Sequence, residues 1–175
     1  IAEIKELNNR ATGEDQIRKA MNELKIWENS TEFIMFEHMK TFLIKEWKEV
    51  MTEVGDNQSL LQSLKDSVYA DLFDEEIKAW EVKLTNLSEY LHNLNIIQRK
   101  WLYLEPIFSR GALPSEQARF QRVDKDFKSI MNEITYDKRV LQLAKKQLKD
   151  RLNVMVEQLE LCQKALNDFL EEKRS

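Results

Sequence analysis

Apolar side chains in the last part of the chain recur in alternating steps of four and three residues. The series is Leu148, Leu152, Met155, Leu159, Cys162, Leu166 and Phe169. Because an α-helix turns once every 3.6 residues, this spacing places the whole series on one face. It predicts a helix of about 27 residues, roughly 40 Å long at 1.5 Å per residue. A continuous apolar face must be buried against a neighbour, so the pattern favours a helical bundle.

Two further stripes of the same kind precede it. One runs from residue 74 to 104, where Gln98 is the one polar interruption, and the other begins after Pro114. Asp74 is expected to be the N-cap of the first helix, and Pro114 suits the first turn of the second. The first stripe comprises Ile77, Trp80, Leu84, Leu87, Leu91, Leu94 and Trp101. The second comprises Phe120, Val123, Phe127, Ile130, Met131 and Ile134.

The first part of the chain has a less regular pattern. Apolar spacing indicates a leading helix over residues 1–28, which Gly13 weakens by about 1 kcal/mol relative to alanine. The stretch TEFIMFEHMKTFLIKEW is denser in Phe and Ile and loses the helical period. It predicts a short β-hairpin over residues 33–44, with strands near Phe33–Glu37 and Thr41–Ile44. A helix then resumes and continues through Gly55, because apolar spacing persists on both sides.

Both prolines lie close to one of the glycines. Pro106, Gly111 and Pro114 fall between long apolar stripes, which predicts a turn between two long helices at 105–114. Long helices joined by short connections pack antiparallel. We therefore expect a mainly α fold, an elongated antiparallel helical bundle over 45–175 with the short hairpin before it, in one partial domain of residues 1–175. The side chains expected to fill the bundle's end are Trp101, Leu104, Phe108, Leu113 and Phe120.

Composition and charge exclude several classes of partner. Apolar residues make up 42% of the chain and charged residues 33%, with a mild net charge of −4. Nucleic acids and anionic membranes are held by basic clusters, and the chain has no run of basic residues, so neither is expected as a partner. No apolar stretch is long enough to span a bilayer. One cysteine suits a reducing compartment and excludes an internal disulfide framework.

The sequence also lacks the patterns of an active site. The three glycines are far apart, so no phosphate-binding loop is expected. His38 and His92 have no further ligands at helical spacing, and each is expected to face solvent or to pack. Cys162 occupies a core position of its stripe and is expected to be a small buried hydrophobe. Pairs of acids such as Asp124 and Asp126 are expected to be solvated. We therefore expect no catalytic, cofactor-binding or metal-binding residue.

The turn region carries a resemblance to a known family. The stretch IQRKWLYLEPIFSRGALPSEQARFQRVDKDFKSIM, residues 97–131, closely resembles the linker region of dynein heavy chains. In that family a helix ends in the signature Q-R-x-W-x-Y-L-E-x-I-F, followed by a loop, Leu-Pro, a Glu and a second helix. The matching residues are Gln98, Arg99, Trp101, Tyr103, Leu104, Glu105, Ile107, Phe108, Leu113, Pro114, Glu116, Phe120, Ile130 and Met131. The short SRGALP loop looks most like the retrograde intraflagellar-transport dyneins, the cytoplasmic type two.

The resemblance implies a mechanical role. In the family, the linker is an elongated helical lever that arches over an AAA+ ring and changes its bend as nucleotide turns over. This chain would be the N-terminal part of that lever, without a cofactor of its own, while ATP or ADP and Mg²⁺ bind in the parent ring. The implied partners are the chain's own AAA+ ring, a second heavy chain, dynein intermediate and light chains, intraflagellar-transport trains and microtubules. The implied location is the cytoplasm and cytoskeleton, in the cilium and its axoneme.

A lever would dock on its ring through protruding groups. The candidates are the hairpin tip, formed by His38, Met39 and Lys40, and Arg110 in the tight loop. Tyr103 and Glu105 could either cap helix ends or meet the ring. The competing hypothesis is a static scaffold or tether of the spectrin-like kind, which composition alone does not separate from a lever.

Overall fold

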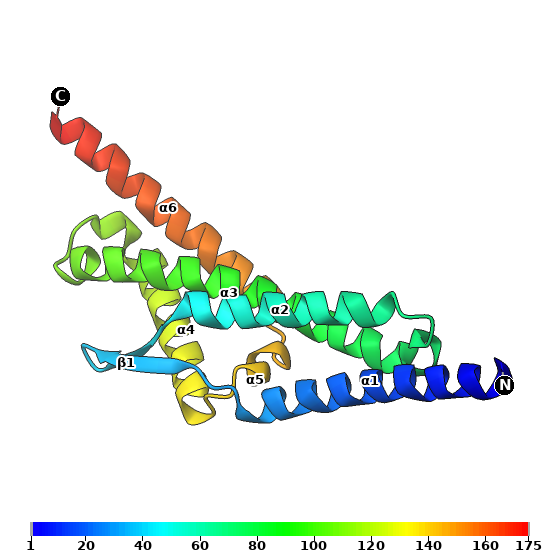
Figure 1. Ribbon diagram of the computed structural model, residues 1–175. Coiled ribbons are helices and arrows are strands. Elements are labelled where there is room, and N and C mark those ends of the chain that lie inside the picture. Colours follow the sequence, from blue (N-terminus) through cyan, green and yellow to red (C-terminus); the bar gives the residue numbers. More distant parts are fainter. Residues whose placement is uncertain (1, 175) are drawn as a thin grey trace. The chain divides into compact units, whose positions relative to one another are not determined.

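The computed structural model describes residues 2–174, and the side chains of residues 11–174. The mainly helical fold and its one antiparallel hairpin are confirmed (Figure 1). In chain order the elements are α1 (Ala2–Ser30), β1 (Ile34–His38), β2 (Thr41–Lys45), α2 (Trp47–Lys65), the 3₁₀ turn η1 (Ala70–Phe73), α3 (Asp74–Ser109), the 3₁₀ turn η2 (Pro114–Glu116), α4 (Gln117–Tyr136), α5 (Leu141–Ala144) and α6 (Lys149–Arg174).

The chain forms two compact units, which are described separately. The α1 unit comprises Ile1–Phe33, Glu46–Ser88 and Arg139–Lys145. The hairpin unit comprises Ile34–Lys45, Glu89–Lys138 and Lys146–Ser175. Helix α3 contributes its first turns to the α1 unit and its remainder to the hairpin unit.

In the α1 unit, α1 lies beside α2 and η1 (Figure 1). Its core is formed by side chains from α1, α2 and the start of α3 that are spaced by three or four residues, as the stripes predict. These buried side chains include Ile17, Leu24, Val50, Val54, Leu61, Ile77, Leu84 and Leu87. Trp27 and Trp80 meet at a centroid distance of 6.5 Å. Beside them the Lys83 ammonium lies 2.6 Å from the Glu28 carboxylate.

Two glycines lie inside helices of this unit, for different reasons. The ring of Tyr69 lies directly against Gly13 in α1, where it occupies the place of an added Cβ. Around Gly55, in the middle of α2, no atom would contact an added Cβ. The predicted continuity of the helix through Gly55 is confirmed. Gly13 therefore serves close packing, whereas nothing in the structure requires Gly55.

We expect Gly13→Ala and Gly55→Ala to change stability in opposite directions. Alanine at 13 gains helix propensity but overpacks against Tyr69, at an expected cost of about 1–3 kcal/mol. Alanine at 55 gains propensity without a clash, which should add about 0.5–1 kcal/mol. Urea denaturation of both variants measures these changes. Equal stabilisation by the two substitutions would show that the Tyr69 contact does not constrain α1.

In the hairpin unit, β1 and β2 pair antiparallel with His38 opposite Thr41 and Ile34 opposite Lys45. The predicted hairpin is confirmed, with strand ends shifted by one residue. The two residues between the strands, Met39 and Lys40, have φ values of 48° and 71°. Two positive φ angles in a two-residue loop define a type I′ turn, which normally takes Asn or Gly. Met39 and Lys40 at the hairpin tip therefore adopt a turn type that these two residue types disfavour.

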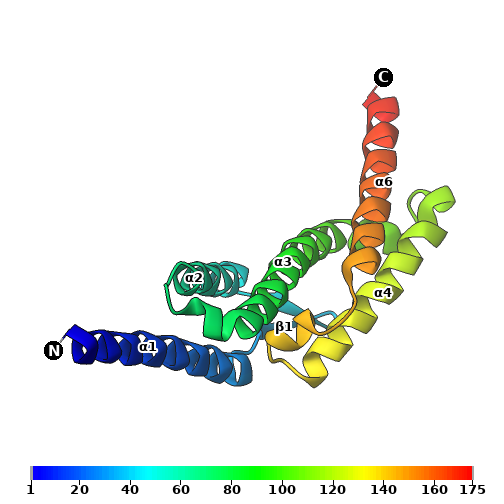
Figure 2. The ribbon, with the colours of Figure 1, turned by 90° about the vertical axis from the view of Figure 1, so that its right-hand side faces the viewer.

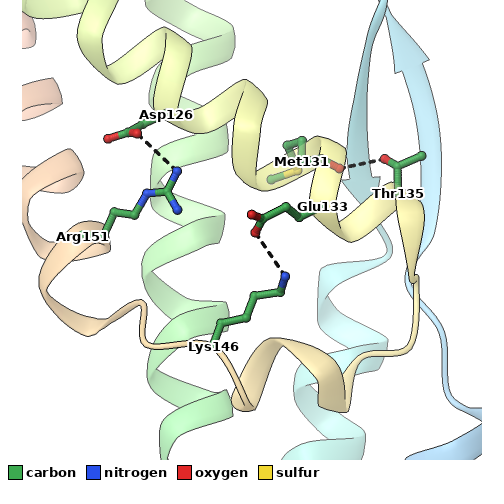
Figure 3. A network of polar contacts seen from close by, with 6 residues as sticks. All are labelled: Asp126, Met131, Glu133, Thr135, Lys146 and Arg151. Atoms are coloured by element: carbon green, nitrogen blue, oxygen red, sulfur yellow. Dashed lines mark hydrogen bonds and ion pairs between the residues drawn. The ribbon is translucent and has the colours of Figure 1, made fainter.

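Helices α4 and α6 pack against each other in the same unit (Figure 2). All six residues of the predicted α4 stripe are buried. The members of the predicted α6 stripe from Leu148 to Leu166 are also buried, but its last member, Phe169, is 38% exposed. Ion pairs link α4 to the chain that leads into α6 and to its first turn (Figure 3). Arg151 binds Asp126 at 3.2 Å, and Lys146 binds Glu133 at 3.1 Å.

Two details of α3 differ from expectation. Asp74 is not an N-cap, because its φ of −54° and ψ of −47° place it inside the helix, which continues directly from η1. The turn expected at 105–114 is narrower, because α3 passes through Pro106 to Ser109. Proline removes one helical hydrogen bond, at a cost of about 3 kcal/mol. Burial of Phe108, two residues further on, explains why the helix continues past the proline.

Candidate functional site

Trp101 is the centre of the matched motif and lies in α3 within the hairpin unit. Its side chain is only 2% exposed, and its ring centroid is 4.9 Å from that of Phe127 in α4. The indole Nε1–H donates a 2.7 Å hydrogen bond to Asp124 Oδ1. Asp124 Oδ2 also binds Lys128 at 3.1 Å. The expectation of a merely solvated Asp124 is therefore wrong, because this carboxylate satisfies a buried indole and ties α3 to α4.

A second aromatic contact lies beside the loop that joins α3 to α4. Phe108 and Phe120 stack with a centroid distance of 4.8 Å and an interplanar angle of 8°. Gln117 Nε2 donates to the carbonyl oxygens of Phe108, at 2.9 Å, and Ala112, at 2.8 Å. This amide therefore ties the last turn of α3 to the loop that follows it, by bonding to one carbonyl in each. Leu113 is half-buried in a left-handed conformation, with φ of 51°, so it is not a fully buried member of the expected cluster.

Gln98 joins α3 to the hairpin. It is 4% exposed, and its amide makes two hydrogen bonds to the main chain of one residue, Ile44 in β2. Oε1 accepts from the Ile44 N–H at 3.0 Å, and Nε2 donates to the Ile44 carbonyl at 2.7 Å. In the sequence, Gln98 stood out as an interruption of an apolar stripe and as a motif residue, but its partner was not predicted. The interruption itself was the available signal, since a buried polar side chain needs partners.

The other motif residues divide by burial. Leu104, Ile130 and Met131 are buried with the aromatic residues. Glu105, Ile107 and Glu116 are half-buried, whereas Arg99, Tyr103 and Pro114 are exposed. Glu116 binds Arg119 Nε at 2.8 Å, and Arg119 in turn donates to Gln158 of α6 at 2.7 Å. Tyr103 is 52% exposed, which places it on the surface rather than at a helix cap.

The four docking candidates are not equivalent. Met39 is 74% exposed, and Lys40 and Arg110 are also exposed. His38 is half-buried, because its ring meets Trp101 edge-on at a centroid distance of 6.3 Å. The hairpin tip thus presents Met39 and Lys40 outward, while His38 connects it to the Trp101 cluster.

The structure offers little chemistry beyond these contacts. Within residues 2–174, no group of His, Cys, Asp and Glu side chains gathers in a way that could hold a metal ion. Burial raises the pKa of the Cys162 thiol to about 11, and the negative charge of Glu116 adds to the shift. The thiol is therefore protonated at neutral pH and a poor nucleophile. Among the described residues, no helix is long and apolar enough to cross a membrane. The contacts of this site fix the hairpin to α3 and α3 to α4, and they leave Met39 and Lys40 of the hairpin tip exposed.

The chain is similar to known proteins along its whole length. Residues 1–175 match the family described as "Dynein heavy chain, N-terminal region 2". The chain is 54% identical over 178 residues to cytoplasmic dynein 2 heavy chain 1 of Tripneustes gratilla and 52% identical over 182 residues to that of Homo sapiens. These alignments cover 98% and 99% of the chain. Human dynein axonemal heavy chain 10 is 36% identical over 185 residues, covering 98% of the chain. The chain spans about 4% of the length of each of these relatives.

Proposed function

The chain belongs to the dynein heavy chain family, and from this premise we propose that it is a lever segment of a cytoplasmic dynein 2 motor. In this role it is the N-terminal part of the linker and carries conformational change from an AAA+ ring to the tail. The observation that carries the proposal is the match over nearly the whole chain to cytoplasmic dynein 2 heavy chains. The resemblance at fourteen motif positions between Gln98 and Met131 supports the placement in the linker.

The contacts inside the hairpin unit suit a segment that transmits force. The hairpin is joined to α3 through Gln98 and through the edge of His38 on Trp101. Helix α3 is joined to α4 through the Trp101–Asp124 hydrogen bond and the Phe108–Phe120 stack. Close-packed side chains of this kind resist deformation, whereas a flexible linker would absorb it. Force applied at the hairpin tip would therefore reach both long helices.

We assign ring docking to the outward residues of the hairpin tip, with Arg110 as a second point. Met39 and Lys40 are held in left-handed conformations that cost free energy for residues with a Cβ. Strained backbone of this kind concentrates at functional positions. Lys40 and Arg110 would supply positive charge, and Met39 an exposed, adaptable apolar contact.

In this role, ATP or ADP and Mg²⁺ bind, and hydrolysis takes place, in the AAA+ ring of the parent chain, outside this segment. Its partners are the ring itself, a second heavy chain, dynein intermediate and light chains, intraflagellar-transport trains and microtubules. It acts in the cytoplasm and cytoskeleton of the cilium, in minus-end-directed retrograde transport. The protein would thus be a mechanical part of an ATPase rather than an enzyme in its own right.

The test uses the full-length heavy chain with a donor fluorophore at exposed Val68 and an acceptor on the AAA+ ring. If this segment is a lever, energy transfer between them changes between the ATP-bound, ADP-bound and nucleotide-free states. A second donor position at exposed Tyr136 checks that the change does not come from one dye. The same transfer efficiency in every nucleotide state, at both positions, would favour a static, spectrin-like scaffold instead.

A further inference from the structure

The two hydrogen bonds of Gln98 reveal which way the hairpin's main chain points. Both the N–H and the carbonyl of Ile44 bond to this side chain of α3, so both point away from β1. In an antiparallel ladder, residues opposite each other either exchange two hydrogen bonds or both point outward, and the two cases alternate. Met35 is opposite Ile44, and Glu37 is opposite Phe42. The N–H and C=O groups of Met35 and Glu37 therefore point out from the other edge, that of β1.

The two edges of the hairpin are treated differently. On the β2 edge, the Gln98 amide exchanges two hydrogen bonds with Ile44 as a neighbouring strand would, and α4 lies beside this strand. On the β1 edge, no hydrogen bond to the main chain of Met35 or Glu37 is found within residues 2–174. An open edge of this kind exposes two donors and two acceptors to any extended chain that approaches it.

The β1 edge also lacks the features that normally prevent such pairing. Proteins protect edge strands with lysine, proline or a β-bulge. The residues of β1, Ile34–His38, include no lysine and no proline, and their register with β2 is unbroken. Ile34 is 45% exposed beside this edge. Directly before β1, Glu32 forms a β-bridge with Arg139, so the regular part of the edge that a strand-adding partner could use lies at Met35 and Glu37.

We propose that the outer edge of β1 is a binding site for an extended peptide segment of another protein, which adds a third strand to the hairpin. The main-chain groups of Met35 and Glu37 supply its hydrogen bonds. The bound segment has alternating apolar residues and a lysine or arginine beside Glu37, because Glu37 is an exposed acid of this strand. A second copy of the same acidic edge is a poorer partner for reasons of charge. The site stands on the hairpin geometry and does not depend on the motor assignment.

The test measures binding of the 175-residue chain to a short fluorescent peptide in which valine and threonine alternate around one central lysine. Glu37→Pro removes one outward N–H but no ladder hydrogen bond, so we expect binding to weaken about tenfold. The thermal unfolding of this variant should match that of the wild type. Glu37→Lys keeps the N–H and should weaken binding of the lysine peptide while strengthening that of a matched glutamate peptide. Glu49→Lys, an exposed charge reversal in α2, is the control and should change neither.

Binding to the wild type together with the charge-dependent exchange of preference in Glu37→Lys supports the proposal, even if Glu37→Pro does not fold. Absence of binding to the wild type, or no effect of either Glu37 substitution, overturns it. Self-association of the wild type that Glu37→Lys abolishes, measured by light scattering, also overturns it, because the occupant would then be a second copy of this chain.

Discussion

Replacing Trp101 with alanine is expected to lower the free energy of unfolding by about 3–5 kcal/mol. The indole is 2% exposed and contacts rings from α4 and from the hairpin, so its removal leaves a large cavity at the centre of the hairpin unit. It also removes the donor that binds Asp124 at 2.7 Å. Urea denaturation, followed by circular dichroism, measures the change.

Two variants on the same helix separate the sources of this loss. Trp101→Phe keeps most of the ring packing but loses the Nε1–H, so a smaller loss of about 1–3 kcal/mol is expected. Tyr103→Ala, two residues further on, removes a side chain that is 52% exposed and should change stability by less than about 0.5 kcal/mol. If Trp101→Ala were no more destabilising than Tyr103→Ala, the indole would not be part of the core.

Replacing Gln98 with leucine is expected to cost about 3 kcal/mol, although leucine matches the apolar stripe better. The Ile44 N–H and carbonyl would each lose a partner, and leaving a buried polar group unsatisfied costs about 1–3 kcal/mol. Hydrogen exchange should show where the loss occurs, with faster exchange of the Ile44 amide. Gln62→Leu, at an exposed position of α2, is the matched control and should be nearly neutral.

Gln98→Glu tests the same pair of hydrogen bonds through pH. A protonated carboxyl can accept from the Ile44 N–H and donate to its carbonyl, whereas the ionised form faces that carbonyl with a negative charge. The folded-state pKa of this glutamate should therefore lie above its ordinary value of about 4.3. A raised folded-state pKa gives stability that is present below the unfolded value and lost as the pH rises. Recovery of stability at acidic pH relative to Gln98→Leu is expected; identical behaviour at all pH values would contradict the assigned contacts.

Much of the fold could be predicted because it depends on local periodicity. The spacing of three and four residues in the stripes ending at Ile134 and Phe169 placed α4 and α6 correctly, since burial of one helix face requires that spacing, although Phe169 itself is exposed. The hairpin was found to within one residue from the loss of that period. Continuity through Gly55 followed from the apolar residues on both sides.

The contacts that build the candidate site could not be predicted from the sequence in the same way. Asp124 was expected in solvent, Gln98 was named as a motif residue without a partner, and α3 was expected to end before Pro106. In each case the deciding partner lies far away in sequence: Trp101 for Asp124, Ile44 for Gln98, and Phe120 for the turn of α3 that follows the proline. No local pattern reports such a partner.

The amino-acid sequence by itself determined which segments are helical, where the hairpin turns and which faces are buried, because propensity and apolar spacing act between near neighbours along the chain. It also indicated the family through the signature around Trp101. Only the tertiary structure decided which polar groups are satisfied and by whom. Gln98 bonds to the main chain of one hairpin edge, whereas within residues 2–174 no hydrogen bond to the main chain of Met35 or Glu37 is found at the other. The physical reason is that a buried hydrogen bond depends on the position of two groups in space, which chain order does not specify.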